Sequence, residues 1–143
     1  MRTELTTDLE TCRQLRRVVF IEEQGVSEAE EWDGRDGEAL HVLGWIGDRP
    51  VGTARMLIDG EAGKIGRVCV LPAARGTGAG AAIMREALDI LRARGVKKAK
   101  LASQKSAIGF YEKLGFTAYG PEFLDANIPH RDMVLELGPS AAD

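Results

Sequence analysis

The segment 64–94 constrains the fold most strongly, because it combines three patterns in a fixed order. Apolar β-formers lead up to Pro72, whose missing N–H cannot continue a sheet ladder, so a strand should end there. A glycine-rich turn follows at 75–80, and apolar residues then recur at helical spacing as far as Gly95, a natural helix stop. The segment therefore predicts a strand, a tight turn and an amphipathic helix.

The glycine-rich turn is predicted to bind an anion. Glycines allow positive φ and close backbone approach, and the first turn of a helix offers free N–H groups and a favourable dipole. A pyrophosphate would therefore fit at 76–81. A glycine-rich loop that binds nothing is the alternative. The dinucleotide pattern fits poorly, because four residues separate Leu71 from Gly76 and the next strand ends without an acid at 101–103; no Gly-Lys-Ser/Thr of a P-loop is present.

The rest of the chain predicts an α+β fold in one domain, 1–143, with a mixed, mostly antiparallel seven-stranded sheet flanked by helices. Short turns between the second, third and fourth strands imply an antiparallel meander, and the strand–helix–strand passage after them implies a parallel pair. Strands are expected at 2–5, 39–46, 51–58, 64–71, 96–103, 116–120 and 131–137, helices at 8–23, 81–94 and 104–114, a loop at 123–129, and a frayed tail at 138–143.

Composition excludes several classes of protein. The formal net charge of −3 argues against a nucleic-acid partner. No apolar run has the length of a membrane span and no signal peptide is visible, so a cytoplasmic location without membrane attachment is expected. Cys12 and Cys69 lie in apolar segments and are interpreted as small buried residues rather than a disulfide or a metal pair; no metal site is predicted.

Two motifs resemble the GNAT N-acetyltransferase superfamily. Residues 68–72, VCVLP, followed by Arg75-x-x-Gly78-x-Gly80, resemble its acetyl-CoA motif, Q/R-x-x-G-x-G/A after a V-x-V-x-P strand. Residues 109–116, GFYEKLGF, resemble its second signature, the F-Y-x-x-L-G-F helix. The resemblance covers most of the chain, and FIEEQ at 20–24 with IPH at 128–130 is similar to the small bacterial ElaA/YjcF-like branch.

This resemblance implies acetyl-CoA-dependent N-acetylation of a primary amine, on a small molecule or a peptide, by direct attack on the thioester. It implies that the fourth and fifth strands splay apart, that the pantetheine arm enters the gap, and that Tyr111 lies beside the thioester sulfur as a proton donor. Gln104 stands near the place where the superfamily often has an asparagine that contacts CoA. The implied cofactor-binding residues are Val68, Cys69, Val70, Arg75, Gly76, Thr77, Gly78, Ala79, Gly80, Ala81 and Gln104.

The general base is left open by the sequence. Many members of the superfamily carry a glutamate on the fifth strand, and the matching position here is Ala99. Glu23, Asp33 and His41 are the candidates, and a water relay is a fourth. His41 is otherwise a hydrogen-bonded packing residue of its strand.

The acceptor and the assembly are also open. The acidic segment 26–38 is either a solvated loop with a short helix or an acceptor-binding lip that favours cationic amines. A degenerate acyltransferase that binds CoA and regulates another process is the rival function, favoured by Ala99 and disfavoured by Tyr111. A homodimer is one candidate assembly.

Overall fold

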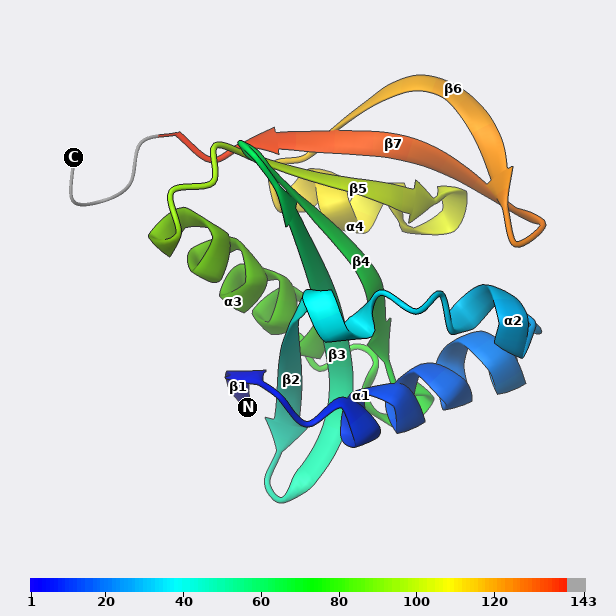
Figure 1. The fold of residues 1–143 in the computed structure, drawn as a ribbon. Helices are drawn as coiled ribbons and strands as arrows, with labels where there is room; N and C mark the ends of the chain where they lie inside the picture. The colour runs from blue at the N-terminus through cyan, green and yellow to red at the C-terminus, as the bar shows by residue number, and fades with distance from the viewer. Residues whose placement is uncertain (139–143) are drawn as a thin grey trace.

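The computed structural model describes residues 1–138 and shows a seven-stranded sheet in the order β1-β2-β3-β4-β5-β7-β6 (Figure 1). All neighbouring strands are antiparallel except β4 and β5. The predicted α+β fold with a mixed, mostly antiparallel sheet is confirmed. The elements are β1 Arg2–Thr6, α1 Leu9–Arg16, α2 Glu28–Glu31, β2 Leu40–Ile46, β3 Arg49–Asp59, β4 Ala62–Val70, α3 Ala79–Ala93, β5 Lys98–Gln104, α4 Ile108–Lys113, β6 Thr117–Asp125 and β7 Ile128–Glu136.

Helices cover both faces of the sheet. The apolar stripe of α3, together with α4, packs on one face and makes the main core with Met56, Ile65 and Met133. A smaller core joins α1 to the other face through Cys12 and Cys69, both buried and free. Burial of these apolar side chains on both faces is the main contribution to the stability of the fold.

The packing of α3 explains two glycines of the sheet. A Cβ on Gly52 would lie 2.6 Å from the Ile83 Cδ1, and one on Gly44 would lie 2.8 Å from the same atom. At Gly44 the Ile83 side chain would have to move. At Gly52 the Cys69 carbonyl oxygen, also 2.6 Å from the added Cβ, would have to shift with its strand. The two glycines therefore leave room for Ile83 of α3 to pack against the centre of the sheet.

The sheet divides between β4 and β5. Their parallel pairing covers only Ala62–Lys64 against Lys98–Lys100, whereas β5 pairs with β7 along its whole length. Beyond Lys64 the two strands part, so the next stretch of β4 has no partner on that side. This confirms the strand separation that the family resemblance implied.

The helices predicted at 8–23 and 104–114 differ in outcome. The Asp8 side chain accepts a hydrogen bond from the Thr11 N–H at 3.1 Å and caps α1, which continues as a π-helix over Arg17–Glu23 and so reaches the predicted end. The helix predicted at 104–114 is wrong in length, because Gln104 is still the last residue of β5 and α4 has six residues. None of the helices in residues 1–138 is long and apolar enough to cross a membrane.

The C-terminal region differs most from the prediction. The loop expected at 123–129 is instead the tip of a hairpin, in which β6 and β7 are joined by Ala126 and Asn127. Both residues have positive φ, of 49° and 65°, as a two-residue hairpin turn of type I′ requires. An irregularity in the pairing between Tyr119 and Phe123 accommodates the proline between them. The tail expected to fray lies, apart from Gly138, outside the described residues.

Candidate active site

A cleft of about 450 Å³ lies where β4 and β5 separate. Its walls come from the end of the first helix, the acidic segment, both parted strands, α4 and the tip of the β6–β7 hairpin. The sequence-predicted residues that line it are Glu23, Asp33, Val68, Cys69, Val70, Arg75, Gln104 and Tyr111. The fold thus gathers residues from positions 23 to 111 around one opening.

The glycine-rich turn has the backbone that anion binding needs. Gly76 and Gly78 have φ of 80° and 86°, and α3 begins at Ala79 without any side-chain cap. The first N–H groups of this 15-residue helix therefore lack intrahelical partners. Residues 76–81 do not line the cleft itself, but they follow directly on Arg75, which does.

Arg75 and Glu23, which both line the cleft, form a two-point ion pair. The guanidinium Nη1 and Nη2 donate to the two Glu23 carboxylate oxygens at 2.7 and 2.6 Å, and Nε donates to the Val70 carbonyl at 3.1 Å. Hydrogen bonding from Arg75 lowers the pKa of Glu23, and the same contact raises the pKa of Arg75. Glu23 is therefore a weak proton acceptor while this pair is intact.

Tyr111 reaches the cleft from α4. Its ring packs edge-on against Phe110 and Phe116, with centroids 5.0 and 6.0 Å away, and its side chain is almost fully buried. Within residues 1–138 its hydroxyl makes no hydrogen bond. Burial, with a smaller effect of Cys69, raises the pKa of Tyr111 above its ordinary value, so the phenol stays protonated at neutral pH.

The other base candidates are placed less favourably for proton transfer. His41 is buried outside the cleft lining, and its Nε2 lies 2.9 Å from the Asp36 carbonyl oxygen. Asp33 lines the cleft but is held by the Arg55 guanidinium at 2.9 and 2.8 Å, and this contact lowers the Asp33 pKa well below its usual range. Ala99 is fully buried in the main core, so its position does not open to the cleft.

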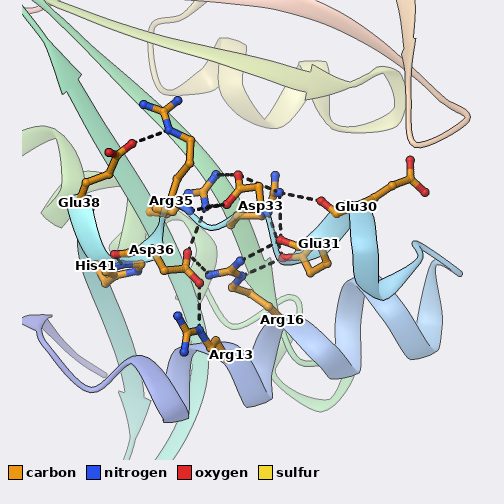
Figure 2. A network of polar contacts seen from close by, with 11 residues as sticks. Arg13, Arg16, Glu30, Glu31, Asp33, Arg35, Asp36, Glu38 and His41 are labelled. Carbon is orange, nitrogen blue, oxygen red and sulfur yellow. Dashed lines mark hydrogen bonds and ion pairs between the residues drawn. The ribbon is translucent and has the colours of Figure 1, made fainter.

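The acidic segment is tied to the sheet by a cluster of arginines and carboxylates (Figure 2). At its centre the fully buried Arg16 donates from Nε to Glu31 at 2.8 Å and from Nη1 to Asp36 at 2.7 Å. We call the whole set the arginine–carboxylate cluster; it comprises Arg13, Arg16, Arg55, Arg67, Glu31, Asp33 and Asp36.

The cluster bears on the hypothesis that segment 26–38 is an acceptor-binding lip that favours cationic amines. Glu31 and Asp36 point inward, and outside the cluster Glu28 pairs with Arg17 at 2.7 Å. The cleft is lined by the carboxylates Glu23, Glu30, Glu31, Asp33 and Asp125 and by the cations Arg35, Arg55, Lys64, Arg67 and Arg75. With five of each sign, its lining is balanced rather than strongly acidic.

Sequence reasoning missed or misplaced two polar residues, one at the end of β5 and one on β7. Gln104, expected at the start of a helix, ends β5, and its Nε2 donates to the Gln24 Oε1 at 2.8 Å. His130 falls between the loop expected at 123–129 and the strand expected at 131–137; it lies in β7 directly opposite Gln104 and lines the cleft. Its position became visible only with the strand pairing, because Pro129 beside it disfavours a strand assignment.

Comparison with known proteins agrees with this geometry. A family model for the acetyltransferase (GNAT) domain matches residues 9–137. The uncharacterized N-acetyltransferase YjcF of Bacillus subtilis is 36% identical over 123 residues, covering 85% of this chain and 88% of YjcF. The crystal structure of Escherichia coli ElaA superposes with a TM-score of 0.83 at 29% identity, covering 95% of this chain and 100% of ElaA.

A more distant structure shares the fold alone. An aminoglycoside 6'-N-acetyltransferase complexed with coenzyme A has a TM-score of 0.78 at 16% identity, with 97% of this chain and 98% of that chain covered. The resemblance to the ElaA/YjcF-like branch is confirmed by the two closer relatives. Because the family model spans nearly the whole chain, this protein belongs to the GNAT acetyltransferase family.

Proposed function

We propose that this protein transfers an acetyl group from acetyl-CoA to a primary amine of a small-molecule or peptidic acceptor by direct attack. The observation that carries the proposal is Tyr111, a protonated phenol with no hydrogen bond within the described chain, which faces the cleft between the parted strands. A free phenol at this place can protonate a departing thiolate. The Tyr111 hydroxyl is not among the fully buried polar atoms of residues 1–138 that lack a partner, so it opens to the cleft, where it can reach a bound thioester.

The residues of the predicted cofactor site fit acetyl-CoA. The backbone of 68–70 is unpaired on its β5 side, so it offers N–H and C=O groups to the amides of pantetheine. The uncapped start of α3 at 78–81 offers N–H groups to the pyrophosphate. The Val70 carbonyl already accepts from the Arg75 Nε, so a cofactor amide would use its second lone pair or displace Arg75. The coenzyme A complex of the distant aminoglycoside acetyltransferase, which has the same fold, supports a CoA thioester as the donor.

The acceptor would enter between the acidic segment and the hairpin tip. Because carboxylates and cations balance in the lining, the charge of the cleft does not by itself select a cationic amine. The preference for cationic acceptors, drawn from the sequence, therefore stays a prediction. The amine would have to be neutral when it attacks the carbonyl carbon of the thioester.

Release of free thiol from acetyl-CoA tests the proposal. The purified protein is incubated with acetyl-CoA together with one class of acceptor at a time: polyamines, aminoglycosides, amino acids or peptides. Acetyl-CoA binding is measured in a second experiment, by calorimetry. Thiol release that depends on one of these amines supports the proposal. Tight binding of acetyl-CoA without turnover of any amine would favour the rival, a CoA-binding module that regulates another process.

A further inference from the structure

We propose that His130 is the general base that removes the proton from the acceptor ammonium, an inference that rests on the proposed acetyl transfer. The first observation is the state of its ring. The Nδ1 lies 2.6 Å from the Ile128 carbonyl oxygen, and because a carbonyl can only accept, Nδ1 must carry the hydrogen. In the neutral imidazole the distal Nε2 is therefore left with its lone pair, and it makes no hydrogen bond within residues 1–138.

The position of His130 places this lone pair at the cleft. His130 lies opposite Gln104 in the β5–β7 ladder, and residues directly opposite each other project on the same face of a sheet. The amide of Gln104 contacts Gln24 at 2.8 Å, so this is the face covered by the end of the first helix. His130, Gln104 and Gln24 all line the cleft.

Packing fixes the orientation of the ring. Phe123, the partner of His130 across the β6–β7 ladder, stacks on it with a centroid distance of 6.0 Å and an interplanar angle of 24°. With one face on Phe123 and Nδ1 bound to the backbone, the imidazole is held with its distal edge directed away from its own strand. A base held in this way needs no reorganisation before it accepts a proton.

The other candidates are committed to other contacts. Glu23 is bound at both oxygens by Arg75, and Asp33 is bound at both oxygens by Arg55. The histidine at position 41 has the opposite arrangement: its Nε2 is bound to a backbone carbonyl, and its Nδ1 is buried without a partner. Only His130 combines a free ring nitrogen with a place in the cleft lining.

The proposed steps balance as follows. His130 Nε2 takes one proton from R–NH3+, directly or through one water, and the resulting amine attacks the carbonyl carbon of the thioester. The C–N bond forms, the C–S bond breaks, and Tyr111 donates its proton to the departing sulfur. The amide nitrogen loses its second proton to the Tyr111 oxygen through solvent, and His130 releases its proton to water. The sum is R–NH3+ plus acetyl-CoA giving R–NH–acetyl, CoA–SH and H+.

Other titratable and charged groups surround this base around the cleft. They come from the hairpin, α4, the first helix, β3, β4 and the turn after it, the acidic segment and β7 itself. They are Asp125, Tyr111, Glu23, Arg55, Lys64, Arg67, Arg75, Glu30, Glu31, Asp33, Arg35 and, on the same face of β7, Asp132. Of these, Glu23 and Asp33 have lowered pKa values and Tyr111 a raised one, so all three keep one charge state near neutral pH.

The test compares His130→Gln with the wild type on one amine acceptor between pH 6 and 10. We expect kcat/KM to fall by about 10²–10⁴ at pH 7, the usual contribution of a general base, with unchanged acetyl-CoA affinity. The deficit should shrink as the pH rises, because the amine then loses its proton to solvent. His130→Ala should be partly rescued by added imidazole. His41→Gln is the matched comparison, since it removes the other histidine and should show no deficit that depends on pH.

Four results would overturn the inference. A deficit of the same size at every pH, without imidazole rescue, would make His130 a structural residue. Long-range 1H–15N spectra of the wild type that show hydrogen on Nε2 rather than Nδ1 would contradict the required tautomer, even if the variants fail to fold. A wild type that binds acetyl-CoA but acetylates no amine would refute the proposed function and, with it, the role of His130. An active wild type with an equally active His130→Gln would refute only the role of His130 as the base.

Discussion

Replacing Arg16 with methionine should strongly destabilise the protein. The Arg16 guanidinium is fully buried and donates to two carboxylates that are themselves buried, Glu31 and Asp36, and also to the Glu31 carbonyl at 3.3 Å. Removal of one partner of a buried ion pair typically costs about 3–5 kcal/mol, because the remaining charge has neither water nor a counter-ion.

The structure favours the lower end of that range. After the substitution Glu31 keeps the Arg67 Nε at 3.0 Å, and Asp36 keeps Arg13 at 3.0 Å and Arg55 at 3.1 Å. The remaining arginines still neutralise both acids, so we expect a loss of about 3 kcal/mol. For a domain of this size that corresponds to a fall in melting temperature of about 10 °C.

The neighbouring residue supplies a matched control. Arg17 also pairs with an acid of the same segment, Glu28, at 2.7 Å, and its side chain and that of Glu28 are exposed. Both arginines lie over Trp32, at 5.3 and 5.6 Å, so the loss of this cation–π contact is common to Arg16→Met and Arg17→Met. The exposed pair contributes about 0–1 kcal/mol, and Arg17→Met should therefore be nearly as stable as the wild type.

Urea unfolding at pH 7, followed by circular dichroism, measures the two free energies of unfolding. Circular dichroism is preferred to tryptophan fluorescence because Trp32 contacts both arginines. Equal stabilities of Arg16→Met and Arg17→Met, within about 1 kcal/mol, would refute the view that burial of the arginine–carboxylate cluster holds the acidic segment on the sheet.

Three further predictions follow from the site. Tyr111→Phe should lower kcat by about 10²–10⁴ while acetyl-CoA affinity and melting temperature stay unchanged, and a kcat within about twofold of wild type would move thiolate protonation to water. Gly78→Val should weaken acetyl-CoA binding at least about tenfold in calorimetry. Gly60→Val is the control, because Gly60 also has positive φ and open space around it, so this variant should show similar backbone strain and normal binding. Equal acetyl-CoA affinities of the two variants would show that the pyrophosphate does not bind at this turn. Burial opposes ionisation of Asp36, but hydrogen bonds from Arg16 and Arg13 outweigh it and lower the pKa to about 2, so this contribution to stability is present above about pH 4 and is lost between about pH 4 and 2. Acid titration of Asp36→Asn, followed by circular dichroism, should show a weaker loss over that interval than the wild type.

Local patterns in the sequence determined the elements around the cofactor site. The proline at 72, the glycines of the turn and the apolar spacing of α3 specify a strand, a turn and a helix without reference to any other part of the chain. Asp8 likewise caps the first helix by a contact three residues away. Such features are readable because backbone conformation and side-chain periodicity depend on near neighbours. The motif resemblance additionally predicted the family and identified Tyr111 as a candidate site residue.

Only the tertiary structure decided which distant side chains meet. From the sequence, segment 26–38 is either a solvated loop or an acceptor-binding lip. In the structure its Asp33 and Asp36 bind Arg55 on β3, about twenty residues away along the chain. His130 became a cleft residue only because β7 extends past Pro129 and pairs with β5. The charges in the sequence show which groups must be neutralised or solvated. The partner of a buried charge, however, depends on strand register and on packing between remote segments, and the local order of residues does not specify these.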